Sequence, residues 1–426
     1  MTTRSDLDRS LGAWFRASAA EAMPDYLDEI VDRVARERQR AWWSSLERWL
    51  PVDLTTRATT LAPPRNVRLV LAAGLIVLIV ATAILAVGST RTRPAPPFGE
   101  ARNGAIVFAT SGDIYQVASI DSPPRLIVGG PAVDSSPLFW RDGTRLGFLR
   151  ESDEAGQEFA LMVADSDGSD VRELVGVSEP PWCADVAPDG SVIAVCAELG
   201  SGRGVYLLKA DGSEAPRHLD IGIHDVAWLG WRPPDGRELV YFDNHSGKLT
   251  LYGVRSDGTG RNLIKHIGVV DSATMGQLDP SLSSDGRFMV YASVDDGVFR
   301  NHLLDLDTGV DGALSLGPVG GHELHGVLSP DGTKLLFHYA DGHTDFIQEM
   351  LAPLDGSAPA IAIGPPYPII NGSADLNQSF SPDGGSIVVY AGHEKVARII
   401  DATTGGRGRP STWETGDLPA WQRQAP

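Results

Sequence analysis

The dipeptide Asp-Gly recurs at nearly constant spacing through the second and larger part of this chain. Its aspartates are Asp142, Asp189, Asp235, Asp285, Asp331 and Asp383, which lie 46 to 52 residues apart. A run of alternating apolar and aromatic residues follows each turn, for example KLLFHY after Asp331. Because Asp-Gly between two β-prone runs is a strong hairpin signal, the sequence predicts six tight turns between antiparallel strands.

A second register of turns lies out of phase with the first. It begins at Asp167, Asp211, Asp257, Asp307, Asp355 and Thr404, and each turn follows an apolar strand such as GVYLLKA. One repeat therefore contains four short antiparallel strands over roughly 48 residues, which is typical of a β-propeller blade. The pattern predicts an all-β propeller over residues 102–426.

The residues around the first turns resemble those of a known family. APDG at 187–190, PPDG at 233–236, LSPDG at 328–332 and FSPDG at 380–384, with the weaker WRDG and SSDG, look like the WD40-like repeats of the periplasmic TolB family. The resemblance implies a propeller fold from about residue 100 to the end. It implies little about activity, because such repeats occur in scaffolds, sensors and the non-catalytic domains of peptidases.

The two ends of the repeat region predict how the ring closes. Residues 104–130 contain three strands of a blade that lacks its first strand, and LPAWQ at 418–422 forms a first strand without a blade. Joining them makes a seventh blade and removes two open sheet edges. We expect seven blades, with six as the alternative.

An apolar stretch precedes the repeats. Residues 69–88 carry no charge, and twenty residues make a helix of about 30 Å, the thickness of a bilayer core. The sequence therefore predicts a transmembrane helix at 67–89, followed by a Pro-rich spacer at 90–101. All of the net charge of −19 lies beyond residue 66.

Residues 1–66 contain three short amphipathic helical patterns and a linker, and we expect them to lie in the cytoplasm. One membrane anchor between such a segment and an exported domain resembles bacterial membrane-anchored anti-sigma factors. That resemblance implies a cytoplasmic protein partner for residues 1–66. The zinc-binding His and Cys residues of many such factors are missing, since the first Cys or His is Cys183.

Two pairs of residues occupy opposed positions across a turn. Cys183 and Cys196 flank Asp189 and are candidates for a disulfide, with two buried thiols as the alternative. His325 and His338 flank Asp331 in the same way, but no third ligand is fixed by spacing, so we predict no metal site. The predicted site residues are therefore the six turn aspartates and the cysteine pair.

The sequence motifs and the charge of the chain favour a binding function over catalysis. The chain has no G-x-S-x-G, P-loop or G-x-G-x-x-G motif, so we expect neither an enzyme nor a cofactor. Its acidic character argues against nucleic acid. The sequence predicts a bacterial single-pass membrane protein whose extracytoplasmic propeller binds a protein, peptide or glycan at its funnel or rim. The alternative is a transmembrane signal regulator.

Overall fold

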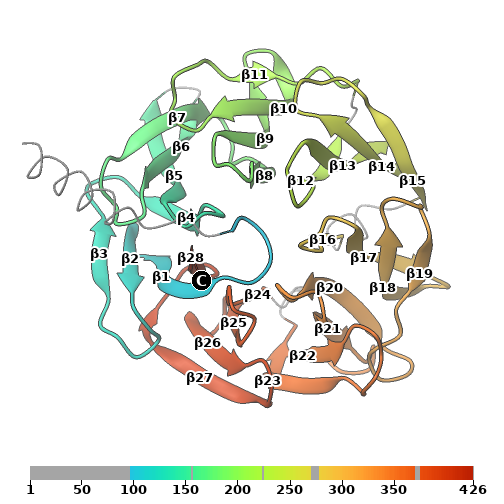
Figure 1. The fold of residues 1–426 in the computed structure, drawn as a ribbon. Helices are drawn as coiled ribbons and strands as arrows, with labels where there is room; N and C mark the ends of the chain where they lie inside the picture. The colour runs from blue at the N-terminus through green and yellow to red at the C-terminus, as the bar shows by residue number, and fades with distance from the viewer. Residues whose placement is uncertain (1–95, 155–156, 223–224, 270–277, 370–374, 426) are drawn as a thin grey trace, which may run out of the picture. The chain divides into compact units, whose positions relative to one another are not determined.

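The computed structural model describes residues 96–154, 157–222, 225–269, 278–369 and 375–425 (Figure 1). Within these ranges the chain forms β-strands and no α-helix, in agreement with the all-β prediction. This part of the chain contains no helix of the length and apolarity that a membrane span needs. The predicted span at 67–89 and the predicted helices in 1–66 lie outside the described ranges.

Consecutive strands pair as antiparallel neighbours in sets of four. The set that contains both ends consists of β28 (Ala420–Gln424), β1 (Arg102–Thr110), β2 (Asp113–Val117) and β3 (Arg125–Val128). The next set consists of β4 (Asp134–Phe139), β5 (Arg145–Glu154), β6 (Gln157–Asp165) and β7 (Arg172–Val177). It is followed by β8 (Cys183–Val186), β9 (Val192–Leu199), β10 (Gly202–Lys209) and β11 (Arg217–His218).

Two further four-stranded sheets and one larger sheet complete the arrangement. The four-stranded sheets are β12 (Val226–Trp231), β13 (Glu238–His245), β14 (Lys248–Arg255) and β15 (Asn262–Val269), then β16 (Ser281–Leu282), β17 (Phe288–Asp295), β18 (Val298–Asp305) and β19 (Asp311–Ala313). The larger sheet contains β20 (His322–Leu328), β21 (Lys334–Ala340), β22 (Phe346–Pro353), β23 (Ile361–Pro368), β24 (Leu376–Phe380), β25 (Ser386–Ala391), β26 (Val396–Asp401) and β27 (Gly405–Glu414). A single parallel bridge between Ile363 and Gly406 joins its halves.

The last strand pairs with the first, so the two ends of the repeat region share one sheet. β28 runs antiparallel to β1 with Ile106 opposite Trp421 and Val107 opposite Ala420. Figure 1 shows the result, a ring of sheets in which β4, β8, β12, β16, β20, β24 and β28 lie nearest the centre. We call these the inner strands. The fold is a β-propeller.

The core consists of separate apolar layers between neighbouring sheets. Val107 and Ile114 of one sheet pack with Leu146 and Phe148 of the next, and the same arrangement recurs around the ring. The final layer joins β25 and β26 to β1 and β2, with the rings of Phe108 and Trp413 stacked at 3.9 Å. Because the middle strands are covered on both faces, they are apolar along most of their length. The burial of this surface is what holds the ring closed.

Candidate functional site

The six predicted Asp-Gly turns all connect an inner strand to the second strand of its sheet. They therefore lie at one end of the inner strands, on one face of the ring, which we call the turn mouth. In every turn an aspartate Oδ1 accepts the backbone N–H two residues later, at 2.9 to 3.2 Å. The six residues hold the turn backbone, as Asx turns do.

Serine strengthens the turn where the segment reads SPDG. The Ser381 hydroxyl donates to Asp383 at 2.6 Å and accepts the N–H of Ser386 at 2.9 Å, and Ser329 does the same in its repeat. Burial alone would raise the pKa of Asp383, but these hydrogen bonds outweigh it and lower the pKa. The carboxylates of these aspartates are thus used to hold the turns in place.

The described part of the spacer, residues 96–101, is fixed to the turn mouth. Arg423 of β28 donates from Nη2 to the carbonyl oxygens of Pro96 at 3.0 Å and Gly99 at 2.6 Å. The guanidinium of Arg141, which follows β4, lies 4.6 Å from the ring centre of Phe98. Burial, with a smaller effect of Arg141, lowers the pKa of Arg423 to about 10, so Arg423 stays charged at neutral pH.

The same segment also contacts turns of other sheets. Ala101 donates its backbone N–H to Pro382 at 2.9 Å, and a Cβ on Gly99 would lie 3.7 Å from the Cβ of Ser284. In Figure 1 the segment before β1 passes across the centre of the ring. The spacer therefore lies across the turn mouth, in contact with residues at the ends of inner strands from several sheets.

The opposite ends of the inner strands form the far mouth, and an acidic residue lies at or near the start of most of them. These residues are Asp134, Asp225, Asp279, Glu323, Asp375 and Asp417. Asp134 is buried and binds Arg150 through both oxygens, at 2.7 and 2.9 Å. The side chain of Asp279 is 67% exposed. The far mouth thus presents carboxylates in very different surroundings.

Two of these carboxylates bind the following sheet at equivalent positions. Asp417 accepts the backbone N–H of Ser136 at 2.7 Å, and Asp279 binds Nδ1 of His325. Ser136 and His325 each lie six residues before a turn aspartate, and each has a positive φ, 53° and 51°. Both lie at a β-bulge, which turns a side chain away from its regular direction. The same backbone geometry therefore carries a serine in one sheet and a histidine in another.

A row of polar side chains leads from His325 into the sheet. The rings of His325 and His338 lie 4.8 Å apart, and Nε2 of His338 lies 3.1 Å from Oε1 of Glu349. That pair has the distance of an ion pair but not the geometry of a hydrogen bond, and neither Glu349 oxygen has a hydrogen-bond partner in the described ranges. Glu349 is fully buried. Burying the Glu349 carboxyl group without a hydrogen-bond partner costs free energy, so Glu349 is a candidate for a functional residue.

Sequence spacing predicts that the two histidines face each other, and they do. It does not reveal Asp279 or Glu349, because neither lies in a recognisable motif. Among the described residues no group of three or more His, Cys, Asp or Glu could hold a metal ion.

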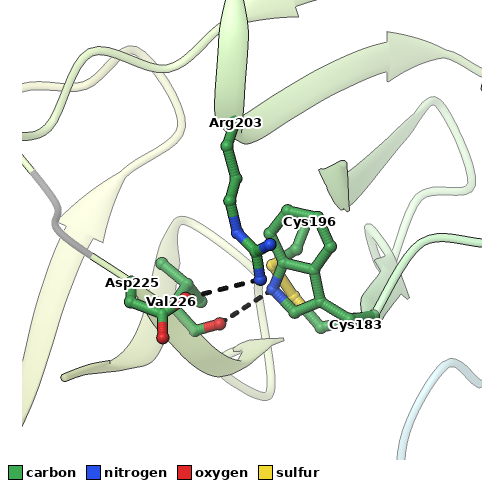
Figure 2. Close-up of a disulfide and its surroundings, with 6 residues drawn as sticks. Cys183, Cys196, Arg203, Asp225 and Val226 are labelled. Atoms are coloured by element: carbon green, nitrogen blue, oxygen red, sulfur yellow. Dashed lines mark hydrogen bonds and ion pairs between the residues drawn. A yellow bond between two sulfur atoms is a disulfide. The ribbon is translucent and has the colours of Figure 1, made fainter. Parts of the chain in front are cut away.

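The cysteines form a disulfide between β8 and β9 near the far mouth (Figure 2). Cys183 and Cys196 are direct partners in the strand register, with their Cα atoms 5.0 Å apart. Beside them, the Arg203 guanidinium lies 4.0 Å from the ring centre of Trp182 and 3.6 Å from Asp225. The disulfide thus joins an inner strand to its neighbour at the mouth away from the spacer.

No family model and no curated protein matches this chain. Among solved structures, TolB from Acinetobacter baumannii is 16% identical, with 74% of this chain and 81% of that chain covered and a TM-score of 0.49. TolB from Agrobacterium tumefaciens is 19% identical, with 68% and 98% covered and a TM-score of 0.44. A prolyl endopeptidase is 13% identical, with 75% and 50% covered and a TM-score of 0.51. At these identities the likeness concerns the propeller fold alone.

Proposed function

We propose that this chain is a membrane-anchored, extracytoplasmic binding module. In this proposal a seven-bladed propeller holds a protein or peptide ligand at its far mouth. The eight-stranded sheet counts as two blades because a single bridge joins its halves. The proposal takes the anchor from the apolar stretch at 69–88.

The observation that carries the proposal is the position of the spacer. Residues 96–101 lie across the turn mouth and are hydrogen-bonded to Arg423 and to the turn at Pro382. Because the spacer occupies the turn mouth, we assign the ligand to the far mouth, which residues 96–101 do not cover.

Two features of the far mouth support binding there. Its carboxylates differ in exposure and partner from blade to blade, so it presents an irregular surface rather than a repeated one. The disulfide beside it suits an oxidising compartment outside the cytoplasm. The proposed activity is binding, and it requires no cofactor.

Photo-crosslinking in intact cells tests this function. A photoreactive amino acid at Asp296, in the turn between β17 and β18 on the far-mouth side, should give a crosslinked partner that mass spectrometry identifies. The same amino acid at Thr308, on the turn-mouth side, is the matched control. Equal adducts from both positions, or adducts from Thr308 alone, would contradict the proposal.

A second candidate function is transmembrane signal regulation, in which residues 1–66 hold a cytoplasmic partner such as a sigma factor. The Arg423 contacts favour it, since they tie the ring to the segment that leads toward the predicted span. Affinity capture on the full-length protein, with a variant lacking residues 1–50 as the control, should recover a cytoplasmic partner only from the full chain. Identical recovery from both would remove this candidate.

A further inference from the structure

We propose that a cavity between the sheet β4–β7 and the sheet β8–β11 binds a small monocarboxylic acid with a compact apolar body, and that Arg141 and Arg423 bind its carboxylate. The two sheets are neighbours in the ring (Figure 1). The cavity has a volume of about 280 Å³. We call it the arginine pocket, and its walls include Leu138, Gly147, Met162, Ile193 and the two arginines. The inference goes beyond the proposed function, because it does not involve the far mouth.

The arginine pocket lies where an apolar side chain is missing from the layer between these sheets. Five residues after the turn aspartate, the other repeats carry an apolar residue that is at most 1% exposed, namely Ala194, Val240, Val290, Leu336 and Val388. In β5 the same position is Gly147. The space that these side chains fill elsewhere is therefore left open in this layer.

The packing around Gly147 does not require a glycine. A Cβ on Gly147 would lie 3.6 Å from Nε1 of Trp140 and 3.9 Å from Cγ of Leu138, which are ordinary van der Waals contacts. A glycine inside a strand weakens the strand, and it often marks a place that a ligand approaches closely. Gly147 thus favours the pocket at the expense of the strand.

The charged residues that line the arginine pocket are two arginines and one aspartate. Nη2 of Arg141 donates to Oδ1 of Asp185 at 2.7 Å, and Oδ2 of Asp185 accepts the backbone N–H of Trp231 at 2.8 Å. Both oxygens of this carboxylate are therefore in use. Arg423 donates only to carbonyl oxygens of the spacer. The described residues thus leave one positive charge of the pocket without an anion.

Both guanidinium groups have donors left for a ligand. An arginine side chain carries five N–H donors, but Arg141 uses only Nη2, and Arg423 uses only Nε and Nη2, within the described ranges. Burial, and then the charge of Arg141, lowers the pKa of Arg423 to about 10. A carboxylate bound to both groups would accept charge-assisted hydrogen bonds and offset the repulsion between them.

Most of the remaining wall of the arginine pocket is apolar. Phe139, Met162, Val186 and Ile193 line it and are each at most 9% exposed. Leu138, by contrast, is 45% exposed, so the pocket is open to solvent beside the inner strand β4. Apolar walls with a few polar groups that point to one place are typical of a small-molecule site. The volume suits one small acid with an aryl or branched alkyl body.

Ligand-observed NMR titration of the full-length protein in detergent tests the inference, with empty micelles as the blank. The probes are phenylacetate and 3-methylbutanoate, and phenylacetamide is the neutral control of the same shape. We expect saturable binding of a carboxylate probe, and binding of phenylacetamide at least about tenfold weaker than that of phenylacetate. Failure of both carboxylates to bind, or equal affinities for phenylacetate and its amide, would overturn the inference.

Substitution of Gly147 tests whether the acid binds in this pocket. Gly147→Val places methyl groups in the cavity, so it should weaken phenylacetate binding at least about tenfold without lowering the melting temperature. Gly312→Val is the matched control, because Gly312 is a strand glycine with open space around it, and it should leave the binding unchanged. Unchanged binding in Gly147→Val would overturn the site.

A second pair of variants tests the arginine independently of Gly147. Arg423→Gln removes the charge that has no anion and should weaken phenylacetate binding at least about tenfold. Arg398→Gln, the same change at an arginine that pairs with Glu394, should alter the binding less than about twofold. Equal losses in both variants would show a diffuse effect of charge and overturn the assignment.

Discussion

The turn mouth and the far mouth are built from opposite ends of the same inner strands but differ in how regular their contacts are. At the turn mouth, six aspartates make the same backbone hydrogen bond, and the spacer lies across them. At the far mouth, acidic residues also recur, but they meet Arg150, the Ser136 backbone and His325 in different blades. The repeated contact stabilises the turns in every sheet, and the varied contacts are the reason that we assign the proposed binding to the far mouth.

The largest expected effect comes from opening the ring at the shared sheet. Deletion of residues 416–426 removes β28, which pairs with β1 and supplies Arg423 to the spacer. Because the apolar layers on both sides lose their cover, the melting temperature should fall by more than 10 °C, a loss of about 7 kcal/mol or more for a ring of roughly 330 residues. Circular dichroism measures it, and an unchanged melt would refute closure by β28.

Glycines of two turns offer a sharper test of the turn mouth. Gly286 and Gly332 both have φ of +72°, but a Cβ on Gly286 would overlap the carbonyl oxygen of Pro233, while Gly332 has open space. Gly332→Ala should cost about 1–2 kcal/mol for the backbone conformation alone. Gly286→Ala should cost clearly more, since the neighbouring turn must move. Equal urea midpoints for the two variants would show that the turns do not pack closely.

Matched aspartate variants compare the mouths directly. Asp383→Ala removes the acceptor of the Ser381 hydroxyl and of the Gly385 N–H, so unfolding should become easier by about 1–2 kcal/mol. Asp279→Ala removes an exposed side chain and should change the urea midpoint little. If Asp279→Ala were the more destabilising variant, the division between a folding mouth and a binding mouth would be wrong.

The smallest effect is a difference in pH dependence. Hydrogen bonds from their turns lower the pKa of Asp189 and Asp285, so the folded carboxylates stabilise the protein above about pH 4 and lose this contribution as the pH falls through their folded pKa. Burial raises the pKa of Glu323 and Asp417 at the far mouth, so their ionisation opposes folding and acidification relieves it. Stability should therefore hold or rise slightly toward pH 5 and fall below pH 4. A steady fall from pH 7 measured by urea unfolding would contradict these directions.

The parts of the molecule that sequence predicts well are those fixed by local chemistry. Asp-Gly turns at regular spacing predict the hairpins, and equal offsets from a turn predict the pairing of Cys183 with Cys196. Closure by the last strand follows from an incomplete blade at each end. Each of these depends on neighbours within one sheet.

The site residues that the sequence does not reveal are brought together by contacts between distant segments of the chain. Arg423 meets the spacer more than 300 positions away, and Asp279 meets His325 across two sheets. Glu349 reads as an ordinary member of a strand until its burial beside His338 is seen. Composition identifies the spacer as a Pro-rich linker but does not indicate that it lies on the ring.

Cysteine labelling of the full-length protein tests the central claim, that residues 96–101 of the spacer lie across the turn mouth and not across the far mouth. Single cysteines would replace Ser284, which lies beside Gly99, and Asp279 at the far mouth. We expect Asp279→Cys to react with a maleimide at the rate of an exposed thiol, and Ser284→Cys to react at least about tenfold more slowly until Arg423→Ala releases the spacer. Equal rates at both positions, unchanged by Arg423→Ala, would contradict the account.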